Sequence, residues 1–261
     1  MDEILDRIGE ALDAAVRVLA PFRPGAVAFA EKGKSGPVTE ADRLVNETLR
    51  EILLRDSEEG WLSEESVDNP DRLGKRRVWI VDPLDGTREF VEGVPEWCVS
   101  IGFVEDGEPL AGGICNPATG EVFIGSIESG VTYSGAAAHA SVRRELQGAL
   151  VLASRTEVKR GEWEQFRDAP FEVRAVGSVA YKLALVSAGL ADATWTLTPK
   201  NEWDVAAGIA LVRSSGGIVK LLDDSPLKLN RRSSKLSGLI ASAPALSEQI
   251  DEFLEPYLEI Q

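Results

Sequence analysis

Two aspartates that follow a short apolar run are the residues whose types and spacing point most directly to chemistry. The run VWIV at 78–81 predicts a buried strand, and the segment DPLDGT at 82–87 follows it directly. Asp82 and Asp85 would lie so close that their carboxylates repel each other unless a cation lies between them. Carboxylate oxygens at a turn suit Mg²⁺, which binds one or two protein carboxylates together with phosphate oxygens of a substrate. The alternative is a plain Asp-Pro turn in which Asp85 is the N-cap of a following helix.

The two residues after Asp85 favour a phosphate site beside the metal. Gly86 has no side chain and lets the backbone approach a ligand closely. A helix that begins near Thr87 would direct its unpaired N–H groups at an anion. The sequence therefore predicts that a metal and a phosphate group share this one turn.

Two further segments could bring acids to the same place. LSEES at 62–66 puts Glu64 and Glu65 at the end of a short apolar run, although a solvated acidic loop would have the same composition. WDVAAG at 203–208 puts Asp204 at the start of a helix of small residues, where an aspartate is also an ordinary N-cap. Because its residues are small, this helix can pack closely and bring Asp204 towards the other half of the chain.

The segment TEAD at 39–42 fits a capping box, in which Thr39 is the N-cap and Asp42 lies three residues further on. A capped helix start also holds a carboxylate rigidly beside a hydroxyl group, and such a pair can orient a water molecule as a general base. The structural and functional explanations are compatible here. Together, the four acidic segments predict a multi-metal phosphate site between the two halves of the chain.

Composition and charge exclude several other functions. The net charge of −15 disfavours binding to nucleic acid polymers and to anionic membranes. No apolar run approaches the ~20 residues that cross a bilayer, and the acidic N-terminus lacks the features of a signal peptide, so a cytoplasmic protein is expected. The single histidine, His139, is expected at the surface, and Cys98 and Cys115 are expected as buried free thiols. Mechanisms that need a histidine are disfavoured, so carboxylates must supply the chemistry.

Apolar periodicity predicts the elements that position these residues. Residues 1–135 form an α+β metal-binding half with a mainly antiparallel sheet, made of helices at 3–19 and 39–55, a loop at 32–37, and strands at 60–62, 78–81, 97–104, 110–115 and 121–125. The weak pattern at 135–147 marks the boundary. Residues 136–261 form an α/β half that contributes Asp204, with strands at 150–153, 171–176, 194–197 and 218–222 and helices at 161–168, 177–190, 205–215 and 245–257.

The order of these motifs resembles that of the inositol monophosphatase superfamily of Mg²⁺-dependent, lithium-sensitive phosphatases. The resemblance covers nearly the whole chain and rests on VTEAD at 38–42, SEES at 63–66, WIVDPLDGT at 79–87, GSVA at 177–180 and WDVAAG at 203–208. It implies an α/β fold, a layered αβαβα sandwich of the inositol monophosphatase and fructose-1,6-bisphosphatase type. It also implies an enzyme that hydrolyses a small phosphorylated metabolite.

The resemblance also implies roles for individual residues. Two or three Mg²⁺ ions are expected, with Li⁺ or Ca²⁺ as inhibitors. The implied metal ligands are Glu64, Asp82, the Leu84 carbonyl group, Asp85 and Asp204. Thr87 and Asp42 would orient and deprotonate the attacking water, with Glu65 in support. The backbone of Gly86 and Thr87 would hold the phosphate group during an in-line attack on phosphorus.

The residues near these motifs indicate which substrate the protein prefers. The segment REF, which contains Arg88 and Glu89, is similar to the bacterial 3′(2′),5′-bisphosphate nucleotidases that hydrolyse 3′-phosphoadenosine 5′-phosphate. PKNEWD at 199–204 is similar to the same group, except that Lys200 stands where those enzymes have a threonine. A lysine there could meet a second phosphate. In contrast, VPEWCVSIGF at 94–103 is equally similar to inositol and histidinol phosphatases.

These features slightly favour a nucleotidase, and the alternatives are an inositol-1-monophosphatase, a fructose-1,6-bisphosphatase or a histidinol-phosphatase. Gly177 and Ser178 of the GSVA segment are further candidate substrate contacts. From other classes, a non-catalytic phosphometabolite-binding protein is a second hypothesis. A structural Ca²⁺-binding protein is a third, although the acids lack the spacing of an EF-hand loop. A homodimer is possible, because many relatives are dimers.

Overall fold

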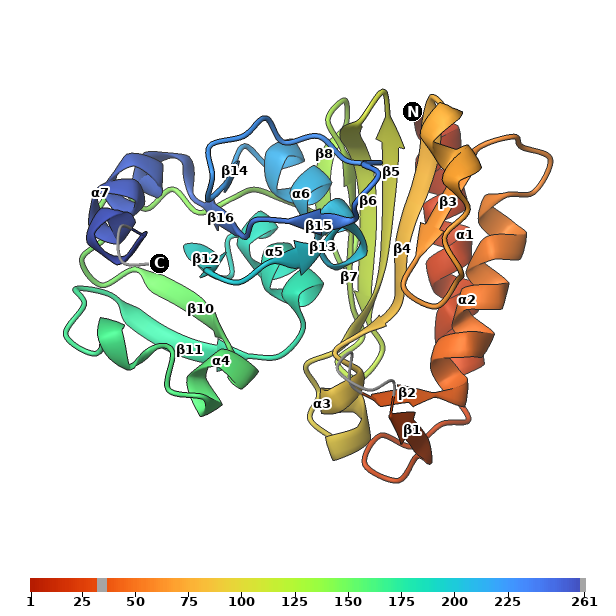
Figure 1. The fold of residues 1–261 in the computed structure, drawn as a ribbon, viewed down its shortest axis with the longest axis horizontal. Coiled ribbons are helices and arrows are strands. Elements are labelled where there is room, and N and C mark those ends of the chain that lie inside the picture. The colour runs from red at the N-terminus through yellow and green to blue at the C-terminus, as the bar shows by residue number, and fades with distance from the viewer. Residues whose placement is uncertain (32–36, 259–261) are drawn as a thin grey trace.

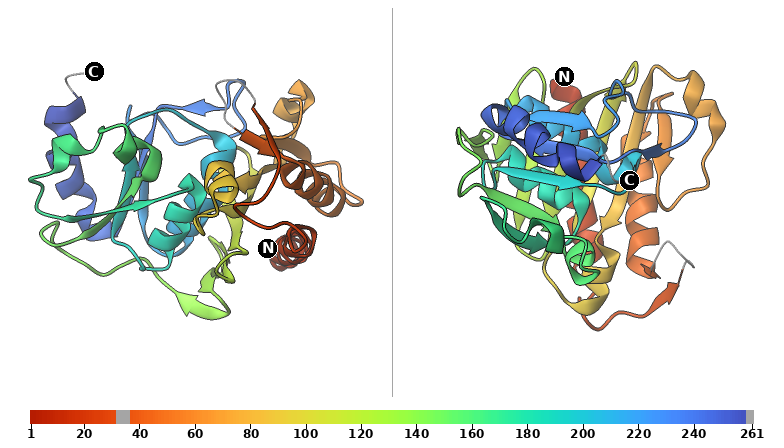
Figure 2. Two further views of the ribbon diagram at one scale, coloured as in Figure 1. Left: turned by 90° about the horizontal axis from the view of Figure 1, so that it is seen from below. Right: turned by 60° about the vertical axis from the view of Figure 1, so that its left-hand side comes forward.

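The computed structural model describes residues 1–31 and 37–258, and its elements form five layers in the order helix, sheet, helix, sheet, helix (Figure 1). Figure 2 shows these layers from two other sides, with the N-terminal helices at one end of the molecule and the C-terminal helix at the other. The predicted αβαβα sandwich has this same order of layers. Of the loop expected at 32–37, only Pro37 lies within the described residues.

Seven strands form the larger sheet, in the order β3-β4-β5-β6-β7-β8-β9. They are β3 Gly60–Ser63, β4 Arg77–Asp85, β5 Cys98–Glu105, β6 Glu108–Asn116, β7 Glu121–Ser126, β8 Gly130–Tyr133 and β9 Ala136–Ala138. β3 runs parallel to β4, and the other neighbouring pairs are antiparallel. The sequence did not predict β8 and β9, and β9 continues the sheet past the expected boundary at residue 135.

Five strands form the smaller sheet, in the order β11-β10-β12-β16-β14. They are β10 Leu150–Ser154, β11 Glu172–Val176, β12 Ala193–Thr196, β14 Ile218–Leu221 and β16 Leu239–Ser242. Two short antiparallel pairs complete the strands of the described residues, namely β1 Phe29–Glu31 with β2 Pro37–Thr39, and β13 Lys200–Asn201 with β15 Lys235–Leu236. β16 is antiparallel to both β12 and β14, whereas β10 is parallel to β11 and β12, so this sheet is mixed.

The helices occupy the three remaining layers. They are α1 Asp2–Leu19 and α2 Glu40–Leu53 on the outer face of the larger sheet, α5 Val179–Ser187 and α6 Glu202–Ser214 between the sheets, and α7 Ser247–Leu258 outside the smaller sheet (Figure 1). Shorter elements are α3 Thr87–Glu92, α4 Arg155–Lys159, and the 3₁₀ turns at Pro70–Gly74, Glu164–Phe166 and Pro244–Leu246. Among helices of the described residues, none combines the length and hydropathy that crossing a bilayer requires.

The outer helices follow the apolar spacing of the sequence. Ile8 and Leu12 of α1 and Val45 and Leu49 of α2 are each at most 2 % exposed. They belong to the same core cluster as Trp79, which β4 contributes from the larger sheet. Burial of such side chains stabilises the fold by roughly 1.5–3 kcal/mol each, so this layer fixes both β4 and the start of α2.

Small residues let α6 lie directly against the larger sheet, as the sequence predicted. A Cβ atom on Gly102 of β5 would lie 2.7 Å from Ala206 Cβ, and one on Gly112 of β6 would lie 2.6 Å from the Ala207 carbonyl oxygen. On the same helix, a Cβ atom on Gly208 would lie 2.4 Å from Leu183 Cβ of α5. The second half of the chain therefore reaches the first across this close contact, with Asp204 at the start of α6.

The helix predicted at 161–168 is wrong. The chain instead forms α4, which ends before a turn at Gly161, where φ is +79°, and a single 3₁₀ turn follows. The reason is an earlier start signal, since the Ser154 hydroxyl accepts a hydrogen bond from the Glu157 backbone N–H at 3.4 Å and caps α4. Two other predictions are confirmed: Cys98 and Cys115 are buried free cysteines, and His139 is exposed.

Candidate active site

A cavity of about 330 Å³ brings together most of the predicted site residues from both halves of the chain. The predicted residues that line it are Glu64, Leu84, Asp85, Gly86, Thr87, Arg88, Glu89, Lys200 and Asp204. The remaining predicted residues do not line it: Asp42, Asp82, Gly177 and Ser178 are buried, and Glu65 is half-buried. The elements around the cavity include β2, α3 and α4, which lie along the lower edge of Figure 1.

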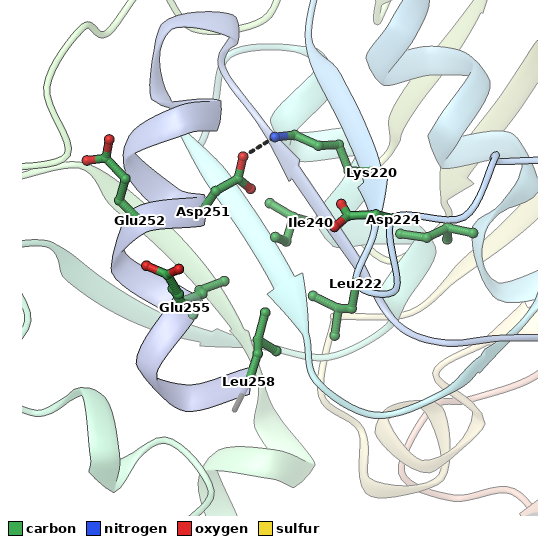
Figure 3. A pocket seen from close by; sticks show the side chains of 10 residues that line it. Lys220, Leu222, Asp224, Ile240, Asp251, Glu252, Glu255 and Leu258 are labelled. Carbon is green, nitrogen blue, oxygen red and sulfur yellow. Dashed lines mark hydrogen bonds and ion pairs between the residues drawn. The ribbon is translucent and has the colours of Figure 1, made fainter. Parts of the chain in front are cut away.

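Another cavity, of about 540 Å³, lies between α7 and strands β14 and β16 (Figure 3). Leucines and Ile240 line it together with Lys220, which forms an ion pair with Asp251. None of the predicted site residues lines this cavity. The chemistry predicted from the sequence therefore belongs to the smaller cavity.

The segment DPLDGT forms the end of β4 and the turn into α3. Its pairing with β5 matches Asp82 with Ser100 and Asp85 with Cys98, so β4 contains one extra residue, which is a β-bulge. The sequence predicted that the strand ends at Val81, but β4 continues to Asp85 through this bulge. Asp82 Oδ1 accepts a hydrogen bond of 3.0 Å from the Leu84 backbone N–H, which holds the carboxylate inside the turn.

Gly86 is the N-cap of α3, so the alternative in which Asp85 caps that helix is wrong. Gly86 has φ +94°, and a Cβ atom there would lie 3.0 Å from the Glu96 carbonyl oxygen. Asp85 instead reaches the start of α5, because its Oδ2 accepts hydrogen bonds from Ser178 Oγ at 2.6 Å and from the Ala180 backbone N–H at 2.7 Å. The turn after β4 is thus tied to the second half of the chain.

Thr87 and Asp42 are in direct contact. Thr87 Oγ1 donates to Asp42 Oδ1 at 3.1 Å and also lies 3.0 Å from the Leu84 carbonyl oxygen. Asp42 Oδ2 accepts from the Thr39 backbone N–H at 2.8 Å, which confirms the predicted capping box, and it also accepts from Thr39 Oγ1 at 2.6 Å. A hydroxyl and a carboxylate from segments far apart in the sequence therefore meet beside the β4 turn.

Asp204 is held by a second capping box. Asn201, and not Asp204, is the N-cap of α6, so the predicted N-cap role of Asp204 is wrong. Asp204 is the third helical residue, and its Oδ2 accepts a hydrogen bond of 2.9 Å from the Asn201 backbone N–H. The buried Glu202 accepts from the backbone N–H groups of Asn230 at 2.8 Å and Arg231 at 2.9 Å. These contacts fix the start of α6.

Glu64 and Glu65 follow the end of β3. Ser63 pairs with Val81 in the parallel ladder of β3 and β4, so the next residues, Glu64 and Asp82, leave the same edge of the sheet. Ser63 Oγ donates to Asn46 Oδ1 of α2 at 2.6 Å and accepts from the Glu65 backbone N–H at 3.2 Å. Glu64 lines the cavity, so the LSEES segment is not merely a solvated loop.

The predicted substrate residues lie in different surroundings. Arg88 is exposed, whereas Glu89 is 6 % exposed, and a Cβ atom on Gly177 would lie 2.4 Å from Glu89 Cγ. Burial raises the pKa of Glu89. Lys200 Nζ lies 2.9 Å from Thr198 Oγ1 and 3.4 Å from Glu157 Oε1. Arg88 and Lys200 line the cavity, while Gly177 provides the space that the Glu89 side chain occupies.

The sequence interpretation missed several residues that line this cavity, which are Ser154, Thr156, Glu157 and Arg160. Glu157 is 3 % exposed and accepts hydrogen bonds from Trp163, Thr196, Thr198 and Lys200. The segment SRTE at 154–157 matches the capping-box signature, so a signal was present in the sequence. This signal was overlooked because the helix was expected at 161–168 instead.

The carboxylates raise one another's pKa. Burial raises the pKa of Asp82 well above its usual range, and the nearby Glu64, Asp85 and Asp204 raise it further. Burial, followed by Asp85, raises the pKa of Asp204 to about 8, although Lys200 acts in the opposite direction. Acids from three separate segments therefore share one region of low polarity, where a cation would relieve their repulsion.

The model of the inositol monophosphatase family matches residues 2–258. The chain belongs to the inositol monophosphatase family. It is therefore a phosphatase, a hydrolase of phosphoric monoesters, and its substrates are small phosphorylated molecules. The motifs on which the resemblance rested lie within the matched residues.

Individual relatives agree with this assignment. The chain is 36% identical over 214 residues to an inositol-1-monophosphatase of Synechocystis, covering 77% of this chain and 72% of that protein. It superposes on an IMPase of Thermotoga maritima with a TM-score of 0.84 and 26% identity, covering 99% of each chain. It also superposes on CysQ of Bacteroides thetaiotaomicron, a bacterial member of the family, with a TM-score of 0.76 and 26% identity, covering 92% of this chain and 96% of that one.

The family generally depends on a metal, and the donors around the cavity fit a hard cation. They are carboxylate and carbonyl oxygens, which Mg²⁺ prefers, and a cation among them would relieve the mutual repulsion that raises the pKa of Asp82. Within residues 1–31 and 37–258, no group of three or more His, Cys, Asp or Glu side chains is arranged so that it could hold a metal ion as it stands. The site is a set of oxygen donors around one cavity rather than a formed cage.

Proposed function

We propose that this family member is a Mg²⁺-dependent phosphomonoesterase that uses a water molecule to hydrolyse its substrate. The observation that carries the proposal is the 3.1 Å contact between Thr87 Oγ1 and Asp42 Oδ1, next to the turn that contains Asp82 and Asp85. A hydroxyl in contact with a carboxylate is suited to orienting a water and taking its proton.

The residues that would hold the ions are Glu64, Asp82, Asp85, Asp204 and the Leu84 carbonyl group. Two or three Mg²⁺ ions would fit the number of acids. When bound, the metal supplies a Lewis acid that neutralises phosphate charge and makes water more acidic. Glu65 would support these ligands through its backbone contact with Ser63.

The remaining steps belong to residues of the chain. The backbone N–H groups of Gly86 and Thr87, at the first turn of α3, would hold phosphate oxygens. Thr87 Oγ1 would accept a hydrogen bond from the attacking water while it donates its own proton to Asp42 Oδ1. Because Thr39 already occupies Asp42 Oδ2, Oδ1 is the oxygen that receives the proton. The water oxygen then forms a bond to phosphorus, and the ester oxygen leaves with the electron pair of the broken P–O bond and takes a proton from solvent water.

For the substrate we propose 3′-phosphoadenosine 5′-phosphate, with a slight preference over inositol 1-phosphate. Three cations, Arg88, Arg160 and Lys200, line the cavity and could meet a second phosphate. The observation that favours inositol 1-phosphate is the similarity to the inositol-1-monophosphatase of Synechocystis. A cytoplasmic location and a homodimer remain predictions of the sequence.

Initial rates with Mg²⁺ on four substrates test this proposal, namely 3′-phosphoadenosine 5′-phosphate, inositol 1-phosphate, fructose 1,6-bisphosphate and histidinol phosphate. The highest kcat/KM is expected for the bisphosphorylated nucleotide. Lys200→Met should raise its KM more than that for inositol 1-phosphate, while Lys159→Met, on the exposed part of α4, should change neither. A clear preference for inositol 1-phosphate would contradict the nucleotidase assignment. If the protein binds these four substrates but hydrolyses none of them, the proposed phosphomonoesterase activity is contradicted.

A further inference from the structure

Lys182 is a buried cation that the proposed mechanism does not use. It lies on α5 and is 3 % exposed, and its neighbours Leu183 and Ala184 on that helix are fully buried. Lysine is almost never fully buried unless its charge has partners. The buried ammonium group of Lys182 must therefore have hydrogen-bond acceptors nearby.

The ammonium group binds the turn that leads into α5. Lys182 Nζ donates to the Ser178 carbonyl oxygen at 2.8 Å and lies 3.5 Å from the Val176 carbonyl oxygen. Ser178 needs such support, because its φ of +58° is a conformation that residues other than glycine rarely adopt. On the other side of the turn, Glu96 Oε2 accepts from the Gly177 backbone N–H at 2.7 Å. The turn is thus held from two directions.

The same turn holds Asp85. Ser178 Oγ and the Ala180 backbone N–H both donate to Asp85 Oδ2, at 2.6 and 2.7 Å. Because both donors use Oδ2, Asp85 Oδ1 is the oxygen that remains to face a cation. A change in the Ser178 backbone would move both donors together, and the carboxylate would rotate with them.

We propose that Lys182 is a positioning residue for Asp85, and that it acts by holding the Ser178 carbonyl so that Ser178 Oγ and the Ala180 N–H keep the carboxylate oriented towards the metal. This inference rests on the proposed function, in which Asp85 is a metal ligand. Partners that orient a ligand are typically worth 10- to 100-fold in metal affinity.

The direction of the change in Mg²⁺ affinity on replacing Lys182 distinguishes a positioning role from a purely electrostatic one. A positive charge near a metal site repels the metal, so its removal alone would tighten Mg²⁺ binding. Loss of the orientation of Asp85 would weaken Mg²⁺ binding instead. A Lys182→Met variant keeps most of the side-chain volume and removes the charge together with the hydrogen bonds, so the sign of the change identifies the dominant effect.

The test is titration calorimetry of the metal-free full chain with Mg²⁺. Lys182→Met should raise the Kd by about ten-fold, and so should Ser178→Ala, which breaks the same link without touching the buried charge. The double variant should be no weaker than the single variants, because both act through one turn. Ser187→Ala, also buried on α5 with its hydroxyl bonded to the Ala184 carbonyl, is the matched control and should bind as the wild type does.

An unchanged or lower Kd in Lys182→Met would overturn the inference, as would an unchanged Kd in Ser178→Ala or losses that multiply in the double variant. If Lys182→Met does not fold, the Mg²⁺ Kd of Ser178→Ala alone tests the inference. A wild-type chain that binds no Mg²⁺ would contradict the proposed metal site itself. Wild-type binding and Mg²⁺-dependent phosphate release, with no loss in the variants, would contradict only the role of Lys182.

Discussion

Asp42 and Asp204 occupy the same local position in the two halves of the chain. Each is the third residue of a helix that begins with a capping box, and in each the Oδ2 atom accepts the N-cap backbone N–H, at 2.8 and 2.9 Å. Helix starts of this kind fix a carboxylate without help from the rest of the fold. The local sequence therefore determines where both carboxylates point.

Their surroundings differ. Asp42 is surrounded by donors, since Thr39 and Thr87 both direct hydroxyl groups at it. Asp204 faces acids, and after burial it is Asp85 that does most to raise its pKa to about 8. In the proposed mechanism the first carboxylate accepts a proton from a hydroxyl or a water, and the second binds a cation. The proposal therefore assigns two kinds of chemistry to the same capping motif, and the difference comes from the tertiary surroundings.

The largest effect expected within this comparison is on catalytic activity, which should respond differently to substitution of Asp42 and of Asp204. Asp42→Asn should lower kcat on the order of 10²-fold or more at every Mg²⁺ concentration, because it removes a proton acceptor. Asp204→Asn should raise the Mg²⁺ concentration needed for half-maximal activity, and excess Mg²⁺ should recover part of the lost rate. Initial rates as a function of Mg²⁺ measure both. The exposed Asp13→Asn is the control, and recovery of Asp42→Asn by Mg²⁺ would remove the distinction.

The buried Lys182 in the second half of the chain should make the stability of the protein depend on pH. Burial lowers its pKa to about 8 from 10.5, while Asp85, Glu157 and Glu89 oppose this shift and Lys200 adds to it. Because the folded-state pKa is lowered, the stability that Lys182 contributes is present above pH 10.5 and is lost as the pH falls through 8.

The free energy of unfolding of the wild type should therefore rise by roughly 3 kcal/mol relative to that of Lys182→Met as the pH increases from 7 to 10.5. Urea unfolding at several pH values between 7 and 10.5 measures the difference. A difference that stays constant over this range would show that Lys182 is not an internal charge.

A slightly smaller effect concerns stability in the presence of metal. Mg²⁺ at 100 times its Kd should raise the free energy of unfolding of the wild type by about 2.7 kcal/mol. The same concentration should stabilise Asp42→Asn equally, since Asp42 interacts with donors, but Asp204→Asn much less. Thermal unfolding with and without Mg²⁺ checks this. Equal stabilisation of the two variants would mean that Asp204 does not hold the metal.

The smallest expected effect tests the shared local motif. Thr39→Ala and Asn201→Ala each remove an N-cap side chain and should each lower the free energy of unfolding by about 1 kcal/mol, within the range of 0.5–2 kcal/mol for such changes. Urea denaturation is the measurement. If only one of the two variants is destabilised, the two helix starts are not equivalent.

Features that depend on nearby residues could be predicted from the sequence. The capping box at 39–42, the central strands of the larger sheet and the close packing of the small residues after Asp204 follow from local spacing and side-chain size. The bulge between Asp82 and Asp85 was missed, because it depends on the pairing of β4 with Ser100 and Cys98.

Other features depend on residues far apart in the chain. Asp85 is bonded to Ser178 and Ala180, and no local pattern indicates that partnership. The burial of Lys182 on α5 likewise depends on tertiary packing, and the helix predicted at 177–190 did not indicate it. The N-cap of α6 was placed at Asp204 rather than at Asn201, because an aspartate and an asparagine are both good caps and only the observed backbone distinguishes them.

Phosphate release by the wild type and by Asp82→Asn, each with Mg²⁺ and with EDTA, tests the central claim most directly. Asp82 is buried at the centre of the acids, and asparagine keeps its size while it removes the charge. Activity is expected only in the wild type with Mg²⁺, with a loss of about 10³-fold in the variant. Activity that persists in Asp82→Asn, or in the wild type with EDTA, would contradict a mechanism based on metal-binding carboxylates.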